Sequence, residues 1–166
     1  MNETDSAQDE CAAPYMIETS SEDQHIIATA IGILERRLRV GVTFNGSSSV
    51  KDYLRLQNSK HRDREAFGAL FLTAQNSLIK YEELFIGTLT QTSVYPREVV
   101  KHALLCGASA VIFTHNHPSG STEPSRADEL LTQTLKSALN LIDVRVLDHI
   151  VTSDLGATSM SERGLI

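Results

Sequence analysis

The sequence has few cysteines and no long apolar run. Its two cysteines are Cys11 and Cys106, and it has no C-x-x-C pair, which excludes a disulfide framework and a thiolate zinc site. Cys106 follows two leucines and is expected to be a small buried hydrophobe. No stretch approaches the roughly 18 consecutive apolar residues of a membrane span. The first ten residues, MNETDSAQDE, lack the basic and apolar regions of a signal peptide. We therefore expect a cytoplasmic protein with no membrane partner.

Positive charge is missing from the first 35 residues, which hold eight acidic residues and no Lys or Arg. Residues 36–166 carry 15 basic and 13 acidic residues, so this part is close to neutral. An acidic end of this kind is typically solvated and disordered, and we predict disorder over residues 1–19. The balance does not predict a strongly basic surface for coating DNA. The total length suits one globular domain.

Residues 20–49 are predicted to form a helix and a linker. Ser21 and Gln24 fit a capping box at the start of the helix, and Gly41 is a plausible end. The segment 45–49, NGSSS, predicts a loop or linker. The apolar residues that recur at helical spacing are Ile27, Ala30, Ile31, Leu34 and Leu38.

Residues 50–166 predict one mixed α/β domain. A hairpin is expected in its first half, and a helix that begins at Pro96 and ends at Gly107 follows it. The order of elements favours a β-sheet flanked by helices in a layered sandwich. The expected helices cover 50–56, 96–106 and about 125–140, and the expected strands cover 66–73, 78–89, 109–114, 142–152 and 157–160.

Two histidines follow the expected strand 109–114. Side chains two residues apart on a strand point the same way, so His115 and His117 project together beside a glycine-containing loop. Asp128 extends the apolar stripe of the next helix, and a carboxylate that faces inward is costly unless it is paired or binds a metal. Two imidazoles and a carboxylate suit zinc. The residues of that stripe are Leu131, Leu135, Ala138 and Ile142.

Each half of this pattern has an alternative explanation. Ser125 and Asp128 also resemble a capping box, in which Asp128 is favoured by the helix dipole. An H-x-H pair can be two satisfied polar residues in a loop. The presence of all four residues in one strand–loop–helix unit favours the metal site.

The segment HNHPSGSTEPSRAD matches the JAMM signature, which is H-x-H, seven residues and S-x-x-D. The segments EELFIGTL, YPREVVKHALLCGASAVIFTHNHPSG, LIDVRVLDHIV and SERGLI resemble those of the RadC branch of the JAB/MPN superfamily, in the same order. The resemblance covers roughly residues 50–166, which we interpret as an MPN (JAB/JAMM) RadC-like domain. It implies a mixed β-sheet flanked by helices, in a cytidine-deaminase-like layered architecture. Residues 1–49 do not resemble the helical DNA-binding segment of longer RadC proteins, so the chain is similar to the shorter form.

The resemblance also implies a chemistry. His115, His117 and Asp128 would bind Zn²⁺ with water in the fourth position, which is the arrangement of a catalytic zinc. Glu65, just before the first core strand, would move the proton, and Ser125 would stabilise the developing oxyanion. The expected activity is hydrolysis of an amide bond by a metallopeptidase or isopeptidase-like enzyme, with a peptide or protein as substrate.

Two other functions stay open. The cluster KHRDR (60–64), with Lys51 and Arg55 nearby, allows a metal-dependent nucleic-acid-processing protein linked to DNA repair, although it lacks aromatic residues. A non-catalytic interaction module stabilised by zinc is the third possibility.

Several further polar residues lie outside the predicted site. Glu82 and Glu83 compete with Glu65 as the proton-transfer residue, but they belong to the EEL segment. Asp148 and His149 are interpreted either as residues that orient the ligands or as a local polar pair. The histidines without ligand-like spacing, which are expected on the surface, are His25, His61 and His102.

Overall fold

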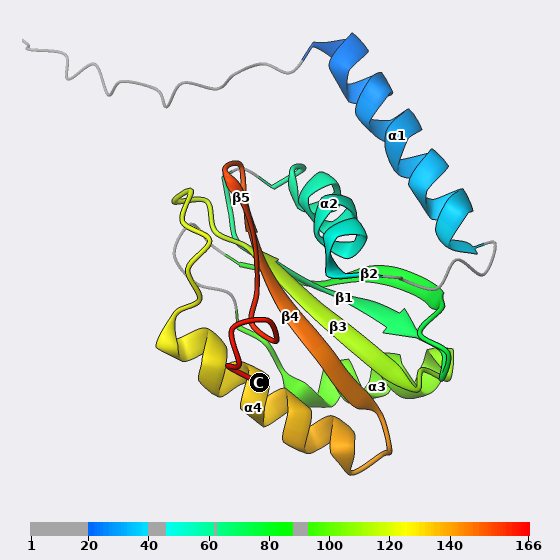
Figure 1. The fold of residues 1–166 in the computed structure, drawn as a ribbon, viewed down its shortest axis with the longest axis vertical. Coiled ribbons are helices and arrows are strands. Elements are labelled where there is room, and N and C mark those ends of the chain that lie inside the picture. The colour runs from blue at the N-terminus through cyan, green and yellow to red at the C-terminus, as the bar shows by residue number, and fades with distance from the viewer. Residues whose placement is uncertain (1–19, 40–45, 62, 88–92) are drawn as a thin grey trace, which may run out of the picture.

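The computed structural model describes residues 20–39, 46–61, 63–87 and 93–166 (Figure 1). For residues 34–39 it describes the backbone only. The predicted disordered segment 1–19 and Gly41 lie outside these residues. Within them, helices and strands are interspersed along the chain. The elements are α1 (Ser21–Arg39), α2 (Ser47–Asn58), β1 (Ala66–Leu72), β2 (Leu78–Ile86), α3 (Pro96–Cys106), β3 (Ala110–Asn116), α4 (Arg126–Asn140), β4 (Arg145–Ser153) and β5 (Gly156–Ser159).

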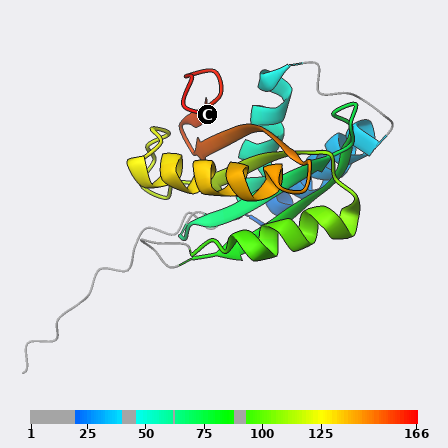
Figure 2. The same ribbon diagram turned by 90° about the horizontal axis from the view of Figure 1, so that it is seen from below.

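The strands form one mixed sheet in the order β2-β1-β3-β4-β5. β1 pairs antiparallel with β2 and β3, β3 pairs parallel with β4, and β4 pairs antiparallel with β5. A parallel pair needs a crossover connection, and α4 supplies it between β3 and β4. α2 covers one face of the sheet, and α3 and α4 cover the other (Figures 1 and 2). The predicted mixed α/β fold with helices on the sheet is confirmed.

Alternation along the strands divides the core between the two faces. Phe67 and Phe71 of β1 face α3 and α4, whereas Leu70 and Leu72 face α2. All seven residues of β1 are buried, as expected for a central strand covered on both sides. The cluster on the α3/α4 face includes Val99, Ala103, Val111, Phe113, Leu135 and Leu139. The cluster on the α2 face includes Val50, Tyr53, Leu54, Ala110, Ile112 and Ile150.

The predicted ends of α3 are confirmed. Pro96 occupies its first turn, where the missing N–H costs nothing. Gly107 ends it with φ of 65°, a left-handed conformation that glycine adopts without strain. Cys106, at the end of the same helix, is half-buried rather than fully buried, and burial raises the pKa of its thiol. None of the helices in the described ranges combines the length and apolarity that crossing a membrane requires.

Several predicted boundaries differ from the structure, and three of the differences have a clear physical reason. The reciprocal cap of α1 is made by Ser20 and Asp23, one residue before the predicted pair. The segment predicted as a loop over 45–49 already belongs to α2 from Ser47, because burial of the apolar side of the helix outweighs the weak helix propensity of serine. β4 begins three residues later than predicted because a turn with Asp143 at φ of 56° precedes it.

Candidate metal centre

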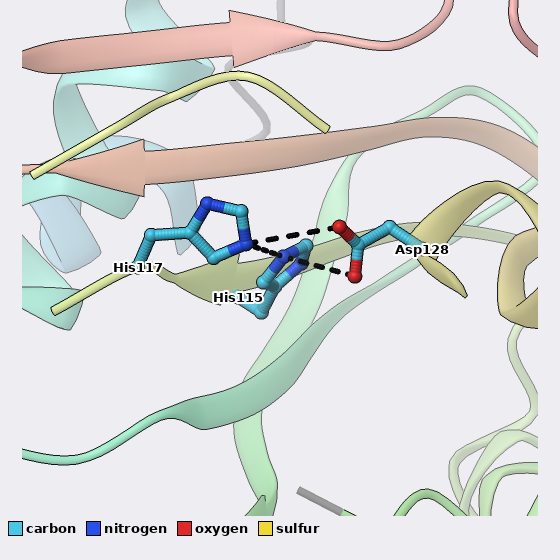
Figure 3. A group of neighbouring side chains, drawn as sticks. All are labelled: His115, His117 and Asp128. Atoms are coloured by element: carbon cyan, nitrogen blue, oxygen red, sulfur yellow. Dashed lines mark hydrogen bonds and ion pairs between the residues drawn. The ribbon is translucent and has the colours of Figure 1, made fainter. Parts of the chain in front are cut away.

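The H-x-H histidines converge at the end of β3. β3 ends at Asn116, so His115 is the last residue but one of the strand and His117 begins the following loop. Their Nε2 atoms lie 2.9 Å apart (Figure 3). The His115 side chain is 1% exposed and that of His117 is 18% exposed. The pair therefore has one buried member and one that reaches solvent.

Asp128 approaches this pair from the first turn of α4 (Figure 3). Its Oδ1 lies 3.3 Å from His115 Nε2, and its Oδ2 lies 3.7 Å from His117 Nε2. The carboxylate is buried on the same side of α4 as Thr132 and Leu135, as the apolar stripe predicts. One ligand atom from each of the three residues falls within 4.8 Å of the others. This cluster can hold a metal ion.

The ring nitrogens of the histidines are suitably disposed for a metal. His117 Nδ1 lies 3.1 Å from the carbonyl oxygen of Ser121, which only accepts hydrogen bonds, so Nδ1 carries the proton and Nε2 is the ligand atom. In a tetrahedral site with Zn–N and Zn–O distances near 2.0–2.1 Å, ligand atoms lie about 3.3 Å apart. The His115–His117 separation of 2.9 Å and the His115–Asp128 Oδ1 separation of 3.3 Å lie close to that value, and the other carboxylate oxygen, Oδ2, lies 3.7 Å from His117 Nε2. Two imidazoles and a carboxylate are donors that suit a divalent metal such as zinc.

Ser125 is the N-cap of α4 and forms the capping box that its spacing allows. Its Oγ donates to Asp128 Oδ2 over 2.6 Å and accepts from the Asp128 N–H over 3.2 Å. The Ser125 N–H donates to the same Oδ2 over 2.7 Å. The alternative explanation from sequence is thus confirmed, yet it does not remove Asp128 from the cluster. Oδ2 serves the cap, and Oδ1 faces His115.

The close approach of the three side chains determines the charge of each of them. Burial on its own would raise the pKa of the Asp128 carboxyl, but bonds with His115, His117 and Ser125 outweigh it and lower that pKa far below the ordinary value. The nearby Asp128 carboxylate raises the pKa of His117 against the opposing effect of burial. The site is therefore a place where positive charge is stabilised, as a cation site requires.

Glu65 is placed by the pairing of β1 with β3. Phe67 pairs with His115, and continuing this antiparallel register puts Glu65, just before β1, opposite His117 and on the same face. Its negative charge also contributes to the raised pKa of His117. Glu65 is half-buried. The predicted proton-transfer residue thus lies beside the predicted ligands.

Asn116, between the two histidines, points to the other face and holds the segment that carries Glu65. Its Oδ1 accepts from the Ala66 N–H over 2.7 Å. Its Nδ2 donates to the carbonyls of His61 and Arg64 over 2.6 and 2.9 Å. Asn116 has no predicted role from the sequence, and only its place as the middle residue of H-x-H marks it there.

Asp148 and His149 are neighbours in the sequence, but their side chains have different partners in the structure. Asp148 accepts from Ser159 Oγ over 2.6 Å and from the Ser161 N–H over 3.0 Å, away from the metal cluster. His149 Nε2 lies 2.8 Å from His115 Nδ1. His149 thus contacts a ligand directly, whereas Asp148 holds the C-terminal turn.

A bulge in β4 explains why spacing did not reveal this. Val111 pairs with Val146, but Ile112 pairs with Asp148, so Leu147 is an extra residue in β4. Simple alternation from Val146, which packs on the α3/α4 face, would send His149 to the opposite face. The extra residue turns it toward His115.

The two glutamates that compete with Glu65 as the proton-transfer residue pair with histidines outside the cluster. Glu82 Oε2 is 2.9 Å from His102 Nδ1, and Glu83 Oε2 is 2.6 Å from His61 Nε2. Both histidines are half-buried and paired with carboxylates, which corrects their predicted placement on the surface, whereas His25 is exposed as predicted. Neither glutamate belongs to the His115–His117–Asp128 cluster.

The small basic cluster is largely engaged with neighbouring polar groups. Lys51 lies 2.5 Å from Glu162, and Arg64 lies 3.0 Å from Asp63. Arg55 donates to the carbonyl of Asp154 over 3.4 Å, and Lys60 donates to Gln57 over 3.0 Å. Arg62 is outside the described residues. Nucleic acid as a partner stays a prediction from sequence.

A three-layer α/β domain with an H-x-H pair at the end of a central strand and a carboxylate at the start of the next helix defines a class of candidate metal-binding domains. A family model described as RadC-like JAB domain matches residues 44–165. The chain is 56% identical to a UPF0758 protein of Leptothrix cholodnii, over 88% of this chain and 65% of that protein. It is 52% identical to one of Variovorax paradoxus, over 91% of this chain and 74% of that protein. A third, from Verminephrobacter eiseniae, is 55% identical over 85% and 59%.

The chain therefore belongs to the RadC-like JAB domain family. It spans about two thirds of the length of the first of these relatives and about three fifths of the third.

Proposed function

We propose that this protein is a zinc-dependent hydrolase that cleaves an amide bond in a peptide or protein, in the manner of a metallopeptidase or isopeptidase. The observation that carries the proposal is the convergence of two imidazole Nε2 atoms and one carboxylate oxygen at the partly exposed end of β3. His115, His117 and Asp128 would hold the ion. Three protein ligands leave a coordination position open, which favours a catalytic over a structural zinc.

The ion, when bound, supplies a Lewis acid that lowers the pKa of water from about 16 to about 7. The chain must then supply a group that accepts the proton of the attacking water and delivers it to the leaving nitrogen. Glu65 suits this task because the β1–β3 register puts it opposite His117, and because its backbone is held on both sides by Asn116. A carboxylate on a fixed backbone is a suitable general base and acid.

Ser125 is proposed to stabilise the carbonyl oxygen as it becomes anionic. Its side chain lies at the N-terminus of α4, where the helix dipole also favours negative charge. Its hydroxyl has one proton, which Asp128 accepts in this structure. The oxyanion role therefore requires that the hydroxyl rotate from Asp128 toward the substrate during the reaction.

The test begins with the zinc content of the purified protein, measured by inductively coupled plasma mass spectrometry. Peptide libraries and isopeptide-linked substrates are then incubated with wild type, Glu65→Gln and Glu83→Gln. Glu83 is the matched control because it is a half-buried carboxylate near β1 that pairs with His61 instead of facing the cluster. We expect about one zinc per chain, cleavage by wild type and Glu83→Gln, and a loss of at least 100-fold in Glu65→Gln.

The other outcomes separate the competing functions. Stoichiometric zinc with no cleavage of any peptide or isopeptide substrate would sink the proposed hydrolysis and favour the zinc-stabilised interaction module. Metal-dependent cleavage of DNA that is lost in Glu65→Gln would favour the nucleic-acid-processing protein instead. A Glu83→Gln variant as inactive as Glu65→Gln would remove the specific role of Glu65.

A further inference from the structure

His149 is a fully buried imidazole in an apolar environment on the α3/α4 face. The rings of Phe67 and Phe113 meet it edge-on, with centroids 5.6 and 5.9 Å away. Both of its nitrogens are nevertheless engaged. Nε2 lies 2.8 Å from His115 Nδ1, and Nδ1 lies 2.6 Å from Thr132 Oγ1. His149 thus contacts the nitrogen of His115 that does not face Asp128, and packing alone does not explain this polar contact.

The direction of each hydrogen bond follows from Thr132. Its Oγ1 lies 2.6 Å from the carbonyl oxygen of Asp128, which only accepts, so the single hydroxyl proton is donated there. Thr132 must then accept from His149, which places a proton on His149 Nδ1. A second proton on the ring would leave a cation among phenylalanines, so His149 Nε2 is bare and accepts from His115 Nδ1–H. In its neutral form, His115 then has a bare Nε2, because a neutral imidazole carries a single N–H.

We propose that Thr132 and His149 are positioning residues that hold His115 in the tautomer with a bare Nε2 directed at the metal position. The hydrogen bond at one nitrogen of an imidazole decides which nitrogen binds a metal. The inference rests on the proposed function in one respect, namely that the cluster binds zinc.

The same hydrogen bonds join the two elements that carry the ligands. Thr132 lies one turn after Asp128 on α4, and His149 lies on β4 beside β3. The chain of bonds therefore runs from the ligand on β3 through β4 to the backbone of the ligand on α4. It fixes the orientation of the His115 ring and the position of the Asp128 backbone together.

Thr132→Val tests the proposal because it keeps the shape of the side chain and removes the acceptor for His149 Nδ1–H. The matched control is Thr134→Val, since Thr134 makes the same kind of bond to the carbonyl four residues earlier, over 2.8 Å, on the exposed side of α4. Zinc affinity is measured by competition with a chromophoric chelator. We expect affinity to fall about 10- to 100-fold in Thr132→Val and to change less than about twofold in Thr134→Val. Thr132→Ser restores the hydroxyl and should bind within about threefold of wild type.

Nitrogen-15 NMR of the histidine rings gives a second readout that needs no metal. Metal-free wild type should show His115 protonated at Nδ1, and Thr132→Val should shift His115 toward protonation at Nε2. A wild-type His115 protonated at Nε2, or equal zinc affinity in Thr132→Val and Thr134→Val, would overturn the inference. If wild type binds no zinc but the tautomers behave as stated, the zinc hydrolase fails while the positioning of His115 stands.

Discussion

The two oxygens of the Asp128 carboxylate face two different partners. Oδ2 accepts from the Ser125 hydroxyl and N–H at the start of α4, while Oδ1 faces His115. In this site the cap orients the carboxylate toward the histidines, because fixing Oδ2 fixes the direction of Oδ1.

Ser125 therefore has a structural role and a proposed chemical role, and two substitutions separate them. At an N-cap, Ser→Ala costs about 1 kcal/mol of stability, whereas Ser→Gly costs a few tenths. We expect Ser125→Ala to be destabilised by about 1 kcal/mol in urea unfolding and Ser125→Gly by much less. Both lack the hydroxyl, so both should lose about 100-fold or more in amide hydrolysis. Activity that follows stability, with Ser125→Gly close to wild type, would contradict the oxyanion role.

The sequence predicts the three residues of the cluster but not the side chains that hydrogen-bond to them. His115, His117 and Asp128 were predicted from strand alternation and a helical stripe, two local periods that the structure preserves. His149 could not be assigned in the same way, because Leu147 interrupts the alternation of β4. A bulge depends on pairing with a neighbouring strand, which a local pattern does not contain.

Helices and strands are predictable where apolar residues recur at a regular spacing along the sequence. β1, β3 and α4 were located to within one or two residues, because apolar runs and amphipathic stripes dominate their sequences. The start of α2 was not, since Ser47 and its neighbours are neutral to helix formation and the helix is stabilised by Val50, Tyr53 and Leu54 against the sheet. Element ends thus follow from tertiary contacts more than from composition.

At one end of the β1–β3 pair, the side chain of Asn116 joins the end of β3 to the segment that carries Glu65. Asn116→Ala would leave the buried Ala66 N–H without its acceptor, at a cost of about 2–3 kcal/mol. Because Glu65 would lose its support, hydrolysis should fall at least tenfold, while zinc binding by side chains on the other face changes little. Urea unfolding, zinc titration and peptide cleavage measure the three quantities.

Asn58→Ala is the matched control for this prediction. Asn58 is an equally buried amide at the end of α2 that donates to Thr114 and Thr152 over 2.9 and 2.7 Å. It should lose a similar free energy of unfolding and keep its activity once corrected for the folded fraction. Equal loss of activity in both variants would mean that general loosening, and not the position of Glu65, limits hydrolysis.

At the scale of the whole molecule, most of the net negative charge and the apolar core lie in different parts of the chain. Residues 46–166 carry 12 basic and 13 acidic residues, so the net charge of -6 arises mainly before the region matched by the family model. The two apolar clusters draw on α2, α3, α4 and the sheet, and neither includes a described residue of α1. The domain matched by the family model thus has its own core on both faces of the sheet.

That core should keep the domain folded without metal, which distinguishes a catalytic zinc from a structural one. The predicted ligands lie at the end of β3 and the start of α4, outside both apolar clusters, and α4 already has a complete N-cap. Zinc at 100 times its Kd would add about 2.7 kcal/mol by mass action, which corresponds to about 5–11 °C in Tm for a chain of this size. We therefore expect chelation to lower Tm by roughly that amount while the far-UV circular dichroism and the cooperative transition persist.

The Asp128→Asn variant serves as the control for chelation, because removal of a charged ligand should make its Tm nearly independent of zinc. Calorimetry and circular dichroism on both proteins, with zinc and with chelator, complete the comparison. If chelated wild type loses its cooperative transition, the metal is needed for folding, as in small zinc-stabilised modules. A folded metal-free domain instead means that the free energy of zinc binding is available for chemistry, because the two apolar clusters already maintain the fold.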